Sequence, residues 1–315
     1  MPILCGTDYS EFATHAAEAA AHLARRMRDR LVLLHVGRTR DDDEQLPPER
    51  ATALLKKRGK VVTQLTDQAE RLRALGVEVH EEIIAGEADE VLADYADTIS
   101  AHSVFVGTHG RRGFRAWGTG SVAARTAQLA RRPCVVWRGK PDRWAAWADG
   151  KAPLRVMCGV DFSPATERAL DWVNSLAEAG PIELHLAHIL WPPNEQKRQA
   201  AKDKMPHAAA EPPHPLHGSL DVANPPDMEA ICRQDLEARL RGQFPAGSAL
   251  EIRPNWGRPA DALTEWADDV GTDVLVIATR HLTGIAGLWE GSVAQGAIAT
   301  ARCAVASIPP PLAPA

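Results

Sequence analysis

The sequence ILCGTDYS at residues 3–10 recurs as VMCGVDFS at residues 156–163, at an offset of 153 residues. The same offset carries LHV at residues 34–36 onto AHI at residues 187–189. Similarity at a fixed, long offset marks a repeated structural unit. The chain is therefore predicted to contain two copies of one domain.

The second copy carries an insertion. GSVA at residues 120–123 returns at residues 291–294, now at an offset of 171, so the second copy has gained 18 residues. Within the interval that must hold them, residues 191–226 are rich in Pro and His and show no apolar period. We predict that residues 191–226 form an insert.

The length agrees with this organisation, because 315 residues is about twice the size of a typical domain. The first domain is predicted to span residues 1–140 and the second residues 154–310. Between them, Gly, Pro, Lys and Asp interrupt the pattern in a predicted linker at residues 141–153. Trp144 and Trp147 in this linker have the size and character to pack onto a domain.

Short apolar runs alternate with segments of helical period in each copy. After the first run, apolar side chains recur at steps of three and four, which predicts a helix with one apolar face made by Phe12, Ala16, Ala19, Leu23 and Met27. Further helices are predicted at 48–75, 89–99 and 121–131, and strands at 3–6, 31–36, 77–84, 103–106 and 134–137. In the second copy, Ser163-Pro164 is predicted to start the first helix, with Ser163 as its cap.

The alternation of strands with long helices determines the fold class. It requires right-handed crossovers and a mainly parallel sheet. Each half is predicted to be a doubly wound α/β domain, Rossmann-like, with five strands and helices on both faces.

Composition excludes several classes of protein. The chain has 45% apolar and 24% charged residues, no apolar run long enough to span a membrane, and a polar segment near its start. A cytoplasmic protein without membrane contact is expected. The net charge of −5 argues against nucleic-acid binding. Five scattered cysteines without a CxxC pair predict neither disulfides nor a zinc site, and each is interpreted as a small buried side chain.

The segment after the fourth predicted strand has the character of a phosphate site. It reads GTHGRRGFRAWGTGS over residues 107–121, and a helix is predicted to begin at Ser121. Glycines allow the backbone to approach an anion, and a helix N-terminus supplies free N–H groups with the positive end of its dipole. Arg111, Arg112 and Arg115 either add positive charge there or are simply solvated.

The loop also resembles a known family. Its spacing, from Gly107 through Gly110 to Gly120-Ser121, is similar to the G-x2-G-x9-G-(S/T) nucleotide loop of the ATP-binding branch of the universal stress protein family. Asp8 at the end of the first strand, the LHV of the second strand and the strand order resemble that family as well. The resemblance covers both halves except the linker and the insert, and it implies a tandem protein with an adenine nucleotide alpha-hydrolase-like fold.

This resemblance implies that ATP, with or without Mg²⁺, binds in the first domain. The residues that it places at the nucleotide are Gly6, Thr7, Asp8, Val36, Val106, Gly107, Thr108, Gly110, Gly120, Ser121 and Val122. Asp8 can accept a hydrogen bond from a ribose hydroxyl or a base amine, although an Asp in this position can also cap a helix. Val36 can equally be a core residue. No catalytic or metal-ligating residue is assigned.

The second copy departs from the pattern. Ala278 stands in the place of Gly107 and His281 in that of Gly110, while Asp161 and Ile189 persist. Side chains at the glycine positions would obstruct the phosphates. The second domain is therefore interpreted as a degenerate binder or a structural partner, and one nucleotide per chain is expected.

Two functions remain open: a nucleotide-dependent regulatory or stress-response protein, and a slow ATPase or phosphotransferase that uses the same site. Phosphoryl transfer needs a held metal and a group that orients the nucleophile, and beyond Asp8 and Ser121 the site offers little of that kind. Binding is therefore favoured.

Alternative ligand sites are disfavoured by context. The match of residues 118–123 to G-x-G-x-x-A lies too late in its domain for a dinucleotide site, and a Walker loop is absent from the sequence. His207, His214 and His217 lie among prolines without the spacing of metal ligands.

The resemblance also implies pairing through the last strand of each domain. Residues 134–137 and 304–308 are apolar, so the two halves are predicted to pair as a pseudo-twofold unit. A homodimer of such chains is expected in addition.

Overall fold

The fold was analysed in a computed structural model. It describes residues 1–37, 48–108, 121–191, 195, 198, 225–245, 247–255, 257–279 and 293–310, with side chains described from residue 58 in the second helix, 122 in the fourth and 228 in the eighth. Gly110, Gly120, His281, the three histidines of the insert and most of the insert itself lie outside these residues.

Both halves repeat one order of strands and helices. The first half contains β1 (Ile3–Gly6), α1 (Glu11–Met27), β2 (Leu31–Gly37), α2 (Pro48–Arg73), β3 (Val79–Ala85), α3 (Ala88–Thr98), β4 (Ser103–Gly107), α4 (Ser121–Leu129) and β5 (Cys134–Trp137). After α5 (Asp142–Ala148), the second half contains β6 (Leu154–Gly159), α6 (Ala165–Ala179), β7 (Ile182–Leu190), α8 (Pro225–Arg239), β8 (Ala249–Pro254), α9 (Pro259–Asp269), β9 (Val274–Ala278), α10 (Val293–Thr300) and β10 (Ala304–Ile308).

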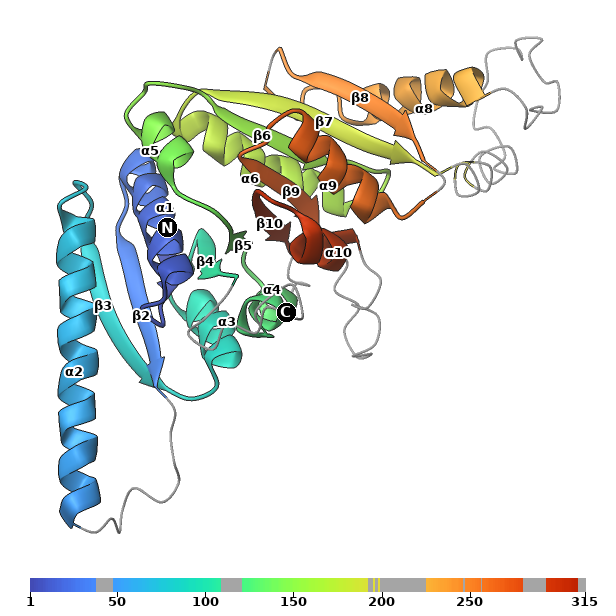
Figure 1. The fold of residues 1–315 in the computed structure, drawn as a ribbon. Helices are drawn as coiled ribbons and strands as arrows, with labels where there is room; N and C mark the ends of the chain where they lie inside the picture. Colours follow the sequence, from blue (N-terminus) through green and yellow to red (C-terminus); the bar gives the residue numbers. More distant parts are fainter. Residues whose placement is uncertain are drawn as a thin grey trace.

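The strands form one sheet of ten, in the order β3-β2-β1-β4-β5-β10-β9-β6-β7-β8 (Figure 1). Within each half all neighbours are parallel, whereas β5 and β10 pair antiparallel with Val136 opposite Val305. The predicted parallel α/β fold is confirmed. The pairing expected between the two last strands is also present, within a single chain, so a homodimer would need a different surface.

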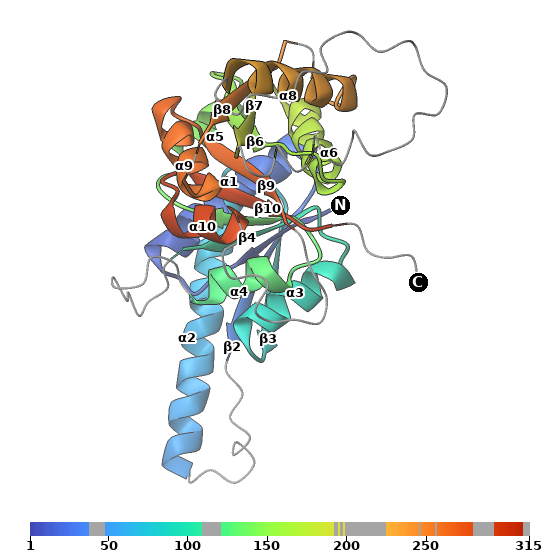
Figure 2. The same ribbon diagram turned by 90° about the vertical axis from the view of Figure 1, so that its right-hand side faces the viewer.

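Two apolar layers hold helices against the two faces of the sheet (Figure 2). One buried cluster joins the sheet to α1, α2, α5, α6 and α8, and the other joins it to α3, α4, α9 and α10. The central strands are buried on both faces and read as continuous apolar runs, as parallel strands between two helical layers must. In both views α2 continues beyond the end of the sheet.

Helix α1 is more deeply buried than its sequence period predicts. Its buried residues surround the helix instead of forming one stripe: Ala13, Ala16, Ala17, Ala19, Ala20, Ala21, His22, Leu23 and Ala24. Phe12, expected on the apolar face, is 36% exposed at the first turn. The prediction of a single apolar face was wrong because α1 packs against α2, α5 and α6 as well as against the sheet.

The linker is accordingly a structural element. Residues 142–148 form α5, and its Trp144 and Trp147 are both buried in the first apolar layer. Trp144 meets Phe105, Trp137 and Trp147 edge to face, with ring centroids 5.8, 5.4 and 5.9 Å away. Edge-to-face contacts of this kind add stability beyond that of area burial.

The start of α6 also differs from the prediction. The helix begins at Ala165, Pro164 is its N-cap residue, and no side chain caps it. The Ser163 hydroxyl donates instead to Asp161 Oδ1. A nearby carboxylate is a stronger acceptor than a neutral group, so the Ser163 hydroxyl stabilises the turn before the helix and does not cap the helix.

A buried polar chain joins the two halves across their seam. Trp172 Nε1 of α6 donates to Ser103 Oγ at 2.9 Å, and the Ser103 and His102 side chains lie 2.8 Å apart at His102 Nδ1. His102 Nε2 lies 2.9 Å from Ser175 Oγ, which donates to the Trp172 carbonyl. Every hydrogen bond of this network has a donor and an acceptor when His102 is neutral and carries its proton on Nε2. Neutral His102 therefore connects the first half to α6.

The cysteines behave as small apolar residues. Cys5, Cys134, Cys158 and Cys232 are buried and Cys303 is partly buried, all as free thiols. Burial raises the pKa of the Cys134, Cys158, Cys232 and Cys303 thiols to about 12, so they stay protonated at neutral pH.

In the part of the chain that the structure describes, no helix combines the length and apolar character that a bilayer crossing requires. Nor do three or more His, Cys, Asp or Glu side chains of the described residues gather into a metal site.

Candidate functional site

The candidate site lies where the strand order reverses in the first half. β1 pairs with β2 on one side and with β4 on the other, so the segments that leave β1 and β4 diverge at the carboxyl edge of the sheet. Ligands bind outside this edge, at the reversal point, in open parallel sheets. The structure brings Thr7 and Asp8 after β1 next to Gly107 and Thr108 at the end of β4.

The turn after β1 is fixed by its own hydrogen bonds. Thr7 Oγ1 donates to Gln68 Oε1 at 2.8 Å and accepts from the Tyr9 N–H at 3.1 Å. The Thr7 N–H donates to the Leu34 carbonyl at 2.9 Å, so both the hydroxyl and the N–H of Thr7 are committed to the protein. Tyr9 has a positive φ of 63°, which is uncommon for a residue with a side chain and occurs where surrounding contacts impose it.

Asp8 does not cap α1. The N-cap residue is Ser10, whose hydroxyl accepts from the Ala13 N–H at 3.3 Å. Asp8 Oδ1 accepts from the Ser10 N–H at 3.0 Å, which orients the half-buried carboxylate beside the helix start. Helix capping is therefore excluded for Asp8, and its hydrogen bonding to a ligand stays a prediction.

His35 is a site residue for which the sequence analysis assigned no role. Its Nδ1 donates to the Thr7 carbonyl at 2.9 Å, and its ring stacks on Tyr9 with centroids 4.8 Å apart. In the second half His188 Nδ1 bonds the Val160 carbonyl at 2.8 Å. The recurrence of His at these two positions was the available signal, and both histidines fix the turn after the first strand of their domain.

The apolar residues of the predicted site differ in accessibility. Val106 is buried in the second apolar layer and can offer only its backbone to a ligand, whereas Val36 is half-buried at the end of β2. Val122 in the first turn of α4 is 41% exposed. Ser121 is the first residue of α4, as predicted.

The glycines at the ends of β1 and β4 have packing roles of their own. A Cβ at Gly6 would come within 2.8 Å of the Leu92 side chain on α3. A Cβ at Gly107 would come within 2.7 Å of the Phe12 carbonyl carbon and 2.8 Å of the Ala13 nitrogen in α1. Gly107 is therefore required by the start of α1 whatever the loop binds, which corrects the interpretation of its replacement by Ala278 as a loss of phosphate contact alone.

Gly107→Ala is expected to destabilise the protein by about 1–3 kcal/mol, because the new methyl group meets helix backbone that cannot rotate away. Gly37→Ala is the matched control, since a Cβ there would meet nothing within 4 Å. Urea unfolding of both variants measures the difference. Equal midpoints for the two would contradict the packing role of Gly107.

In the second half, the carboxylate of the corresponding turn accepts hydrogen bonds from neighbouring residues. Asp161 Oδ1 accepts from the Ser163 N–H at 2.9 Å and from Thr166 Oγ1 at 2.8 Å, in addition to the Ser163 hydroxyl. The first half has Ala13 at the position of Thr166 and so lacks this hydroxyl. Phe162, the counterpart of Tyr9, is covered by the Arg198 guanidinium, 3.8 Å from its ring centroid.

Arg198 belongs to the predicted insert and is held by carboxylates. Its side chain bonds Glu195 Oε2 at 2.8 Å and lies 2.8 Å from Asp235 Oδ2 on α8. These two partners raise the pKa of Arg198 against the opposing effect of burial. Insert residues thus occupy the surface beside the second turn, a feature that no sequence pattern indicated.

Comparison with known proteins agrees with this architecture. The profile of the Universal stress protein family matches residues 1–138 and again residues 154–309. None of the curated proteins searched matches significantly.

Among solved structures, a universal stress protein from Archaeoglobus fulgidus DSM 4304 is similar over 98% of this chain and 96% of its own, with 14% identity and a TM-score of 0.63. A putative universal stress protein from Pseudomonas aeruginosa UCBPP-PA14 is similar over 98% and 93% of the two chains, with 16% identity and a TM-score of 0.59. At these identities the likeness concerns the fold. The two profile matches together cover most of the sequence, and the chain therefore belongs to the universal stress protein family, with one domain of the family in each half.

Proposed function

We propose that the first half binds ATP at the carboxyl edge of β1 and β4 and that the protein acts as a nucleotide-dependent regulator in a stress response. The observation that carries the proposal is the oriented Asp8 carboxylate beside the ends of β1 and β4. Half-buried Val36 adds apolar surface, and α4 begins at Ser121. The glycine spacing of residues 107–120 and the family membership support the same assignment.

The chemistry of these residues suits the parts of a nucleotide. A carboxylate accepts from ribose hydroxyls or the adenine amine, and the N-terminus of a helix favours phosphate. Gly110 and Gly120 are proposed to let the backbone approach the phosphates. If Mg²⁺ accompanies ATP, the phosphate oxygens are its proposed ligands, since Mg²⁺ prefers oxygen.

The test is calorimetric titration of the full chain with ATP. Asp8→Asn is expected to weaken ATP binding about 10- to 100-fold, because hydrogen bonds to a charged group contribute roughly 1.5–3 kcal/mol each. Asp161→Asn is the matched control and should leave the affinity unchanged, since that carboxylate already accepts from Ser163 and Thr166. Gly110→Val should block the phosphates.

One ATP per chain is the expected stoichiometry. Two equivalent sites would contradict the expected stoichiometry. An affinity that depends on Asp161 and not on Asp8 would place the nucleotide in the second half and refute the proposal. Measuring phosphate release in the same samples separates a binding protein from a slow ATPase, because only the latter turns over and loses turnover in Asp8→Asn.

A further inference from the structure

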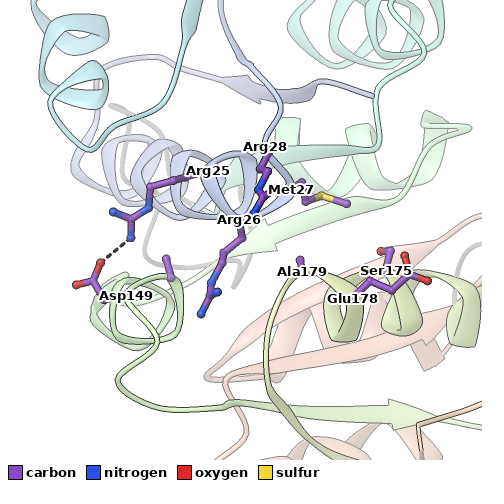
Figure 3. A pocket seen from close by; sticks show the side chains of 9 residues that line it. Arg25, Arg26, Met27, Arg28, Asp149, Ser175, Glu178 and Ala179 are labelled. Atoms are coloured by element: carbon purple, nitrogen blue, oxygen red, sulfur yellow. Dashed lines mark hydrogen bonds and ion pairs between the residues drawn. The ribbon is translucent and has the colours of Figure 1, made fainter.

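A crevice of about 760 Å³ opens between the carboxyl ends of α1, α5 and α6, where the two halves and the linker meet (Figure 3). Its size is that of small-molecule sites in proteins. Three arginines from the end of α1 line it, Arg25, Arg26 and Arg28, together with Asp149 and Glu178. Because Arg25 is paired with Asp149, the lining carries an excess of one positive charge, in a chain whose net charge is −5.

Two of the arginines are held in place by the protein. Arg25 bonds Asp149 Oδ1 at 2.6 Å and the Leu75 carbonyl at 3.3 Å. Arg26 donates from Nε to the Trp147 carbonyl at 3.2 Å, and its guanidinium lies 5.4 Å from the Trp147 ring centroid. Guanidinium groups fixed in this way lose little side-chain entropy when a ligand binds.

The third arginine has its charge available. Arg28 is exposed and ends α1 in the left-handed conformation with φ of 55°, where its own N–H satisfies the last carbonyls of the helix. Within the described part of the chain, no carboxylate lies within ion-pair distance of Arg28. A non-glycine residue in this conformation has a restricted backbone, which fixes where the Arg28 side chain leaves the helix.

The neutral polar group at the crevice is already used. The Ser175 hydroxyl donates a hydrogen bond to the Trp172 carbonyl and accepts one from His102 Nε2. A ligand in the crevice must therefore be recognised by the arginines, whose planar guanidinium groups match the oxygens of phosphate and carboxylate groups. Glu178 and the carboxyl end of α1 oppose the binding of any anion, so a ligand must engage more than one arginine to overcome this repulsion. A molecule with two anionic groups can contact two arginines at once.

We propose that this crevice binds a small molecule carrying at least two negative charges on phosphate or carboxylate oxygens. Arg28 supplies the free charge, and Arg25 and Arg26 form the fixed wall. The site is separate from the nucleotide site, because Arg28 and Asp8 lie beyond opposite ends of the 17-residue helix α1, about 25 Å long. A ligand here contacts α1 and α6 together and stabilises the seam between the two halves.

The test is titration of the full chain with inorganic pyrophosphate and, separately, with citrate, at constant ionic strength and without ATP, which as a polyanion would compete for the crevice. The same titrations of Gly110→Val, in which the phosphates are expected to be blocked from the nucleotide site, show the binding that belongs to the crevice. Arg28→Glu is expected to weaken binding at least tenfold. Arg241→Glu makes the same charge change at an exposed arginine elsewhere on the second half and should leave the affinity unchanged.

Binding of pyrophosphate alone identifies a phosphate ligand, binding of citrate alone a carboxylate ligand, and either supports the proposal when it depends on Arg28. The proposal is overturned if neither anion binds at millimolar concentration, or if Arg28→Glu and Arg241→Glu bind equally. Because the comparison of Arg28→Glu with Arg241→Glu uses no ATP, failure of one proposal leaves the other testable.

Discussion

Trp144→Ala is expected to lower the free energy of unfolding by about 3–5 kcal/mol, the largest effect anticipated for a single substitution in this chain. Trp144 is only 1% exposed, and its indole fills the space among Phe105, Trp137 and Trp147. Truncation would leave a cavity at the junction of α5 with β4 and β5. Because α5 also covers α1, the surroundings cannot collapse into that cavity without losing other contacts.

Urea denaturation followed by circular dichroism measures this loss. Trp191→Ala is the control, since Trp191 is 37% exposed and its removal leaves no comparable cavity. The expected result is a much lower midpoint for Trp144→Ala than for Trp191→Ala. If the two variants unfold at the same urea concentration, α5 is a dispensable linker and the structural role assigned to it is wrong.

The second large effect concerns pH. Burial lowers the pKa of His102 to about 4, with a smaller contribution from the positive charge of the N-terminus. The hydrogen-bond chain acts in the same direction, because Ser103 donates to His102 Nδ1 only when that nitrogen is unprotonated. His102 is therefore neutral in the folded protein throughout the physiological range.

The sign of the pH effect follows from proton uptake. Between pH 6.5 and about 4 the unfolded chain protonates His102 while the folded chain does not, so acidification favours unfolding. The stability contributed by neutral His102 is fully present above pH 6.5 and falls by about 3 kcal/mol as the pH approaches 4. His22 and His188 also have lowered pKa values and contribute with the same sign.

Unfolding free energies of the parent and of His102→Gln, measured from pH 7.5 to 4.5, test this expectation. The variant should be less stable at pH 7.5 and should lose less stability on acidification than the parent. His80→Gln is the control, because His80 is exposed on β3 and lies outside the hydrogen-bond network at the seam. An identical pH dependence for the parent and His102→Gln would show that His102 does not carry the effect.

Local patterns in the sequence were sufficient for the architecture. The bounds predicted for β1 and β5 match the structure, and most others differ by one or two residues at either end. This agreement has a physical cause: parallel strands buried on both faces appear as unbroken apolar runs, and the helices between them show their own period. The repeat at an offset of 153 residues then determined that the same fold occurs twice.

The candidate site was predictable in part. Asp8 follows β1, Gly107 ends β4 and Ser121 begins α4, and any doubly wound fold brings these places to one edge, so their proximity follows from topology. Their individual tasks do not. Only the structure shows that Ser10 and not Asp8 caps α1, that Thr7 is bonded to Gln68, and that Gly107 is needed for the approach of α1.

Tertiary structure alone decided how the two halves are joined. Sequence pattern treated residues 141–153 as a linker, yet α5 buries two tryptophans there. His102 meets Ser175, 73 positions away, and Arg25 meets Asp149, 124 positions away. Such contacts cannot be predicted from sequence period, because nothing in the neighbouring residues indicates the partner. The partner is determined only when the packed sheet brings distant segments together. The sequence by itself thus determined the repeated fold, and tertiary packing decided the seam, its neutral histidine and its cationic crevice.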